Sequence, residues 1–222
     1  DHRDLHSFPT RRSSDLSAGC ANCYAAAMVK RFPAIHEIAR DCLGTVRDIP
    51  FSQVVWHPDR MEQPLRWKKR KTVFVCSLGD LFHDDVPFPI IERVHEVIRK
   101  CHHEFVILTK RPARMAEFWE WRQRRYLNES VVSRPPLNAI YGVSVEDQAT
   151  ASERIQLLLK CLAERHIVSI APVLGQVLLH KYPRAREMSP GGEHDFLRGI
   201  LIQYCGEAKS DAIQAGKLAG LI

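Results

Sequence analysis

Two cysteines near the start of the chain have the type and spacing to bind metal. Cys20 and Cys23 form a C-x-x-C pair in the stretch S-A-G-C-A-N-C-Y-A, directly before a helix-like run over residues 24–31. Thiolates at a helix N-terminus are stabilised by the helix dipole, and this spacing turns both sulfurs toward one point. We therefore expect Cys20 and Cys23 to ligate a metal ion or an iron–sulfur cluster.

Two thiolates complete neither a zinc site nor a cluster, so further ligands are needed. A structural zinc site would require two more Cys or His ligands. A thioredoxin-like redox pair would be expected directly after a strand in a compact βαβ unit. Cluster, zinc and redox pair all remain open at this point.

The elements that would position such a site follow a repeating order. Apolar, β-branched runs predict buried strands, and helical spacing of apolar residues follows several of them. The expected strands are 72–76, 105–108, 139–143, 167–170 and 200–204, with a short further strand within 51–56. This order predicts an α/β fold with a parallel sheet.

The fold we expect is a partial parallel (βα) barrel of the TIM type, truncated at both ends. A full eight-stranded barrel needs about 250 residues, more than this chain has. Glycine-rich nucleotide-binding motifs are absent after every expected strand, which argues against a Rossmann or P-loop protein. One helix is expected over 90–101 and one around Met115, Phe118 and Trp119. A third is expected to begin at a capping box, Thr150-x-x-Glu153, with Asp147 as another candidate for its cap. Residues 180–195 are expected to form a loop.

Composition is typical of a single cytoplasmic domain. The chain has 222 residues, 45% hydrophobic and 26% charged, and lacks an apolar run long enough to span a membrane. Of its seven cysteines, five are scattered singly, which suits a reducing cytoplasm better than a disulfide framework. The net charge of +6 is compatible with nucleic-acid contact.

The first residues look foreign to the domain. The segment H-S-F-P-T-R-R-S-S-D-L over 6–16 is similar to a translated sequencing adapter. We therefore exclude residues 1–16 from fold reasoning and expect a single, incomplete α/β domain over 17–222.

Several longer motifs together resemble one family. They are S-A-G-C-A-N-C-Y-A, S-L-G-D-L-F-H-D-D-V-P, L-T-K-R-P-A-R-M, G-V-S-V-E-D-Q and S-I-A-P-V-L-G. The family is phage-associated, of unknown function, and named after gene products thirty-seven and sixty-eight. Its members carry a three-cysteine motif, C-x6-C-x2-C-Y, in which the first cysteine corresponds here to Ser13.

The three-cysteine motif of that family is similar to the motif of radical S-adenosylmethionine (SAM) enzymes. The resemblance implies a [4Fe–4S] cluster and SAM as cofactors, with zinc as the alternative metal. Two departures, Ala171 in place of a glutamate and C-G-E-A at 205–208, together with Ser13, predict that this chain as given is inactive.

Polar residues after the expected strands are the candidate cofactor-binding groups. On the radical SAM interpretation, Asp80 would hold the amino group of SAM. Lys110 and Arg111 would bind a carboxylate or phosphate, or form ion pairs with carboxylates such as Glu146. Ser144 and Glu146 would bind ribose hydroxyls, and Glu207 is a further strand-end candidate.

Two other functions remain open. His83 with nearby carboxylates would suit a zinc-dependent or other metal-dependent barrel hydrolase, unless Asp84 or Asp85 caps a helix beside a solvated His83. The second is a non-catalytic, phage-encoded metal-binding module acting on nucleic acid or a partner protein. The run from Trp119 to Arg125 would suit nucleic acid, or an amphipathic helix with one buried tryptophan and solvated arginines. The substrate is not specified by the sequence.

Overall fold

The fold centres on a parallel β-sheet. The computed structural model describes Ser17, Cys20, Arg31, Val54, Trp56 and residues 58–126, 134–178 and 202–204. The sheet contains β1 (Thr72–Val75), β2 (Glu104–Thr109), β3 (Ala139–Val145), β4 (His166–Ile170) and β5 (Ile202–Tyr204). Its strands follow the order β1-β2-β3-β4-β5, and every neighbouring pair is parallel. The predicted α/β class and the positions of these strands are confirmed.

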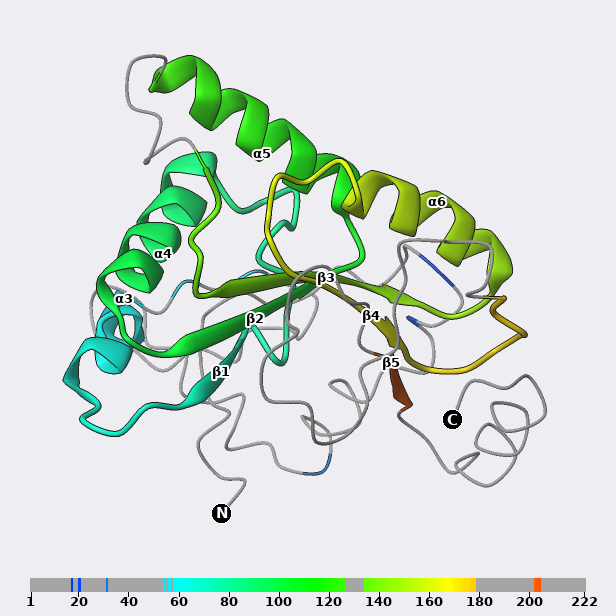
Figure 1. Ribbon diagram of the computed structural model, residues 1–222, viewed down its shortest axis with the longest axis horizontal. Coiled ribbons are helices and arrows are strands. Elements are labelled where there is room, and N and C mark those ends of the chain that lie inside the picture. The colour runs from blue at the N-terminus through cyan, green and yellow to red at the C-terminus, as the bar shows by residue number, and fades with distance from the viewer. Residues whose placement is uncertain are drawn as a thin grey trace.

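Strands β1 to β4 are joined in turn by three helices that lie on the same face of the sheet (Figure 1). These helices are α4 (Phe88–Lys100), α5 (Pro112–Arg125) and α6 (Gln148–Leu158). A right-handed crossover between neighbouring parallel strands places each connecting helix on the same side, so a sequential strand order gathers all three there. Before β1 lie α3 (Pro58–Met61) and η3 (Gln63–Arg66). Most of the short strand expected within 51–56, and the loop over 180–195, lie outside the described residues.

The two faces of the sheet differ in what they carry. Alternate strand residues pack with the helices into the main apolar core, among them Val73, Val75, Phe105, Ile107, Tyr141, Val143, Val168 and Ile170. The opposite face carries Leu108, Gly142 and Ile167, which stand beside one another in the register. Strand side chains alternate between the two faces of the sheet. The polar residues that follow two positions after each of these three residues therefore lie on the same face as they do.

Gly142 lies in β3 at a point where atoms of the neighbouring strands β2 and β4 approach its Cα closely. A Cβ built on it would lie 2.3 Å from Ile167 Cγ1, 2.5 Å from Leu108 Cδ2 and 2.7 Å from the Ile167 carbonyl oxygen. The last of these is a backbone atom and cannot move without disturbing β4. Residue 142 must therefore lack a side chain for this register to form.

Two of the helix caps expected from the sequence, Thr150 and Asp84 or Asp85, were wrong, whereas the expected cap at Asp147 is confirmed. Helix α6 begins earlier than the Thr150-x-x-Glu153 box implied, because Asp147 is its N-cap and accepts a hydrogen bond from the Thr150 backbone N–H at 2.8 Å. Helix α4 is capped by neither Asp84 nor Asp85: its N-cap is Pro87, and no side chain caps it. In each case a competing residue near the boundary, Asp147 or Pro87, fixes where the helix begins.

Helix α5 was predicted to place its arginines in solvent, and Arg122 contradicts this. Trp119 is buried as expected, and Arg124 and Arg125 are exposed, but the Arg122 side chain is 0% exposed. Its guanidinium lies 3.3 Å from a carboxylate oxygen of Glu92 on α4. A buried charge needs such a partner, so this pair ties α4 to α5 beneath the surface.

His95 is a second polar group in the core. Its ring stacks on Tyr141 and Phe118, and Nδ1 donates to the Ile91 carbonyl oxygen at 2.7 Å. Burial lowers the pKa of His95 from 6.5 to about 3, so the ring is neutral at ordinary pH.

Among the described helices, none has the length and apolar character to cross a membrane.

We predict that Gly142→Ala lowers the free energy of unfolding by about 2 kcal/mol, because the added methyl group overpacks the sheet. Gly175→Ala is the matched control, since its nearest contact for a Cβ is 3.2 Å away, on the Asp147 side chain. Urea titration of both variants measures the difference. Equal losses for the two would contradict the close strand approach.

We predict that His95 makes the protein sensitive to acid. The unfolded chain binds a proton at His95 below pH 6.5, whereas the folded chain does so only near pH 3. The contribution of His95 to the free energy of unfolding is therefore fully present above pH 6.5. As the pH drops below that value, this contribution falls by about 1.4 kcal/mol per pH unit. His95→Phe keeps an aromatic ring and should flatten this slope between pH 6 and pH 4, whereas exposed His102→Phe should leave it unchanged. A slope unaltered in His95→Phe would refute the prediction.

Candidate functional site

The carboxylate of Asp80 connects the loop after β1 to the end of β2. Its Oδ1 accepts hydrogen bonds from the Phe82 backbone N–H at 2.9 Å and from Thr109 Oγ1 at 2.8 Å. Its Oδ2 accepts from the Lys110 backbone N–H at 3.1 Å and lies 3.3 Å from Arg111 Nη1. Asp80 is 7% exposed, so these contacts are largely shielded from water.

The contacts of Asp80 have a consequence for its predicted role. A carboxylate offers about four lone-pair positions for hydrogen bonds. Four donor groups of the protein already contact the two oxygens of Asp80. An ammonium group from a ligand would therefore have to displace one of these donors. Binding of the SAM amino group by Asp80 stays a prediction, while the geometry makes Asp80 the group that fixes Lys110 and Arg111.

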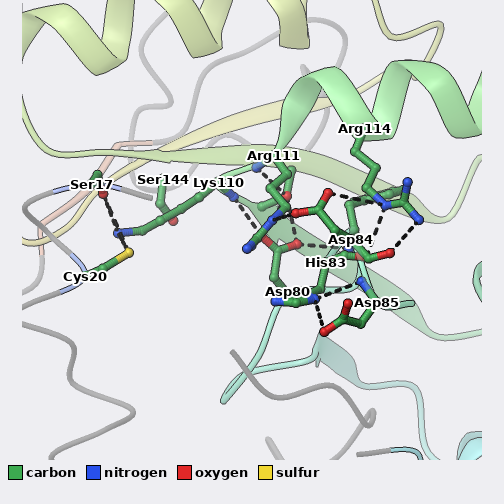
Figure 2. Close-up of polar contacts among 12 residues, drawn as sticks. Ser17, Cys20, Asp80, His83, Asp84, Asp85, Lys110, Arg111, Arg114 and Ser144 are labelled. Carbon is green, nitrogen blue, oxygen red and sulfur yellow. Dashed lines mark hydrogen bonds and ion pairs between the residues drawn. The ribbon is translucent and has the colours of Figure 1, made fainter. Parts of the chain in front are cut away.

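Lys110 and Arg111 are consecutive, and their side chains point in different directions (Figure 2). Arg111 points toward Asp80 and toward exposed Asp84, whose Oδ2 is 3.3 Å from Arg111 Nε. Lys110 points toward Ser17 and Cys20 and forms an ion pair with Glu146 Oε1. The ion pair between Lys110 and Glu146, one of the two alternatives raised by the sequence, is therefore present.

Glu146 follows β3 and its side chain is only 1% exposed. Besides Lys110, it contacts Arg154 of α6, whose Nη1 lies 3.0 Å from Glu146 Oε2. Arg154 also donates to the backbone carbonyl of Ser144. Two cations thus flank one buried carboxylate, which offsets its cost of desolvation and fixes its position.

Asp80, Lys110, Arg111 and Glu146 lie at the carboxyl ends of the strands, a region called the polar edge below. Among the described cysteines, Cys20 is the one that lies there. Its Sγ is 3.7 Å from Lys110 Nζ and 3.7 Å from Ser17 Oγ, and Ser17 donates to Glu146 Oε1 at 2.8 Å. Cys76 and Cys161, by contrast, belong to the apolar core, where burial raises the pKa of the Cys161 thiol to about 11. Cys20 therefore differs from Cys76 and Cys161 in having an ammonium and a hydroxyl group beside its sulfur, and its role as a metal ligand stays a prediction.

The other predicted positions are placed only in part. Ser144 lies on β3, in register with Ser169 of β4, and its backbone carbonyl accepts a hydrogen bond from Arg154. The structure thus brings Cys20, Lys110, Ser144 and Glu146 together, with Asp80 and Arg111 behind them. Cys23, the second predicted metal ligand, lies outside the described residues, as do Ser13 and Glu207.

His83 is not solvated, contrary to one of the two interpretations offered for it. The residue is 3% exposed, and its Nδ1 accepts a hydrogen bond from the Asp85 backbone N–H at 3.1 Å. Burial, and then the charge of Arg111, lower the pKa of His83 below its usual value. Within residues 58–126, 134–178 and the few other described positions, no group of three Cys, His, Asp or Glu side chains is arranged to hold a metal ion.

Three residues at this edge were missed by the sequence analysis: Ser17, Thr109 and Arg154. Thr109 was visible as a hydroxyl residue at the end of a strand, which is a usable signal. Ser17 gave none because it lies 129 residues from Glu146, and Arg154, although only 8 residues away, meets Glu146 through the packing of α6 against β3. Only the folded arrangement pairs them.

We predict that Asp80→Asn destabilises the protein by about 3 kcal/mol, because it leaves buried donors and the Arg111 charge without their carboxylate. Asp84→Asn is the matched control. It removes the other carboxylate that contacts Arg111, but Asp84 is 71% exposed, so the loss should stay below about 1 kcal/mol. Denaturant unfolding compares the two, and a smaller loss for Asp80→Asn than for Asp84→Asn would overturn this ranking.

Comparison with known proteins gives a family but no activity. No curated protein and no solved structure matches the chain. One family matches residues 6–195, a range that begins inside the segment 1–16 interpreted above as adapter-derived and includes every described residue of the polar edge. The chain therefore belongs to the family described as "Protein of unknown function (DUF5131)".

Proposed function

We propose that the chain is a radical SAM-type iron–sulfur protein of phage-associated origin, built on a partial (βα) barrel and acting in the cytoplasm. Its cluster would be ligated by Cys20, Cys23 and a cysteine at the position now held by Ser13. The observation that carries the proposal is the placement of the Cys20 sulfur beside Lys110 and Glu146, at the carboxyl ends of parallel strands.

The winding of the sheet supports this proposal. A sequential strand order with the helices on one face is the winding of a (βα) barrel, whereas doubly wound folds reverse their order near the middle. In (βα) barrels the active site lies at the carboxyl ends of the strands. The polar edge that contains Lys110, Ser144 and Glu146 occupies this position.

The surroundings of Cys20 fit a cluster ligand. Its sulfur is buried, yet an ammonium and a hydroxyl group lie within hydrogen-bonding reach of it. Such donors stabilise a sulfur that carries negative charge, which is the form that binds iron. A [4Fe–4S] cluster held by three thiolates leaves one iron open to the amino and carboxylate groups of SAM, and it supplies the electron for radical chemistry.

The residues around the sulfur would then bind and orient the cofactor. Ser144 and Glu146, which lie at the end of β3, would hydrogen-bond ribose hydroxyls. Ala171 follows β4, and its backbone N–H donates to the Val145 carbonyl oxygen at 3.0 Å, so position 171 is adjacent to Glu146. A glutamate there, as in the family pattern, would add a carboxylate to this edge, which is why its absence bears on activity.

The metal-dependent hydrolase interpretation gains no support from the geometry of His83. Its Nδ1 already accepts a hydrogen bond from the chain, and the ring is buried rather than directed at solvent. The third interpretation, a metal-binding module that contacts nucleic acid or a partner protein, is not favoured by any described contact. Both stay predictions, as does zinc in place of iron.

We predict that Ser13→Cys enables the chain to hold about four irons, as expected for one [4Fe–4S] cluster, because it completes the C-x6-C-x2-C pattern. The chain is purified without oxygen, supplied with iron and sulfide, and analysed for iron, sulfide and zinc. The unaltered chain should bind iron below stoichiometry. Ser14→Cys is the matched control, since it adds the same thiol one position out of the pattern.

Two outcomes would count against the proposal. One is zinc without iron in the Ser13→Cys chain, which would make Cys20 and Cys23 structural. The other is equal iron in the Ser13→Cys and Ser14→Cys chains, which would show that the spacing does not matter. SAM binding to the iron-loaded Ser13→Cys chain, measured by calorimetry, then tests the cofactor separately.

A further inference from the structure

Positively charged side chains gather in one short loop at the amino ends of the strands. The run R-W-K-K-R-K over residues 66–71, called the basic loop below, begins at the last residue of η3 and ends directly before β1. It contains five cations and no acidic residue. Because the strands are parallel, the basic loop and the polar edge lie at opposite ends of the sheet. Its exposed cations are Arg66, Lys68, Lys69 and Arg70, and Lys71 is half-buried.

Two carboxylates border the basic loop, and each already contacts another cation. Glu104 stands opposite Thr72 in the register of β1 and β2, but it forms an ion pair with Arg165. Glu62, on the other side of the loop in the chain, lies 3.9 Å from Arg93. No described carboxylate forms an ion pair with any of the four exposed cations of the loop. Their charge is therefore presented to the surroundings of the protein.

A buried histidine holds both ends of the basic loop. His103 is 0% exposed, its Nε2 donates to the Pro64 carbonyl oxygen at 2.9 Å, and its Nδ1 accepts from the Lys71 backbone N–H at 3.3 Å. These two bonds require a neutral ring that is protonated on Nε2. Burial lowers the pKa of His103 below its usual value, which favours this neutral form. One imidazole thus fixes the start and the end of the loop, so its charges are held together before any partner binds.

The aromatic residue of the loop is used inside the protein. The Trp67 ring is half-buried, lies 5.6 Å from the His103 ring, and has the Lys71 ammonium group 4.9 Å above it. The loop therefore presents charge rather than a surface on which bases could stack. Leu65, directly before the loop, is 44% exposed, and a single leucine is a weak anchor for a bilayer. These features favour a polyanion as the partner, recognised by its charge.

We propose that the basic loop is a docking site for nucleic acid, which it binds through the phosphate backbone without preference for base sequence. Closely spaced phosphates neutralise several cations at once, and release of their counterions drives the binding. Contacts of Lys and Arg with phosphates position a strand but do not read its bases. This inference requires no metal and no cofactor, and it does not depend on the proposed function.

The basic loop differs from the run Trp119 to Arg125, which the sequence offered as a nucleic-acid surface. In that run Trp119 and Arg122 are buried. Exposed Arg124 lies 3.3 Å from Glu120, which offsets its charge. The cations without a carboxylate partner are instead those of the basic loop.

The experiment measures binding of the unaltered chain to a fluorescent single-stranded DNA of mixed sequence by anisotropy, at several salt concentrations. The variant Lys68→Gln/Lys69→Gln removes two exposed charges. At about 0.1 M salt we expect at least about tenfold weaker binding, and a salt dependence of log K whose slope is smaller by about 1.4, because two phosphate contacts are lost. Lys68→Arg/Lys69→Arg keeps both charges and should bind like the unaltered chain. A second DNA of different sequence should bind equally well.

The matched control is Arg93→Gln/Arg124→Gln, which removes the same charge from the outer faces of α4 and α5. Both side chains are exposed, at 64% and 79%. Because salt screens distant surface charges, we expect a change of less than about threefold. Circular dichroism checks that each variant is folded, and the single variant Arg70→Gln replaces the lysine pair if that pair fails to fold.

Three outcomes would overturn the inference. One is an unaltered chain that does not bind DNA at about 0.1 M salt, under conditions where nonspecific phosphate binding is measurable. Another is equal weakening in the two glutamine double variants, which would reduce the effect to general charge. The third is tighter binding to phosphatidylserine vesicles than to DNA, lost in Leu65→Ser, which would assign the loop to a membrane surface. The iron content of the Ser13→Cys chain bears on none of these, so the proposed function stands or falls separately.

Discussion

The structure of the polar edge depends on the buried carboxylate of Asp80. It lies in the loop after β1, yet its acceptors are used by Thr109, Lys110 and Arg111 at the end of β2. Donors buried without an acceptor are costly, so neither segment can leave its place without breaking several hydrogen bonds at once. The carboxylate thereby converts two loops, which would otherwise vary in position, into one rigid support for the residues that follow.

A second buried carboxylate, Glu146, extends that support across the sheet. It joins β3 to α6 through Arg154 and to β2 through Lys110. Both carboxylates therefore act on the same lysine, one through its backbone and the other through its ammonium group. Because the Lys110 side chain ends beside Cys20, the position of a single sulfur is linked to three consecutive strand–loop units.

The sequence predicted the framework better than the buried polar groups. Apolar β-branched runs are local signals, and they placed the strands correctly. Arg122 and His83 were assigned to solvent because charged and polar residues are usually exposed. Both are buried: Glu92 lies opposite Arg122, and the Asp85 backbone N–H donates to Nδ1 of His83. A partner contributed by another helix, or by the backbone, leaves no periodic trace in the sequence.

What the sequence alone determined is the α/β class, the strand positions and the gathering of polar residues at strand ends. These follow from local apolar patterns and from the fixed direction of parallel strands. Only the tertiary structure decided which of those residues meet. It paired Lys110 with Glu146, brought Ser17 and Arg154 to the same carboxylate, and turned Lys110 toward Cys20 and Arg111 away from it. The physical reason is that such contacts depend on the register between strands and on the packing of α6, and both are properties of the whole fold.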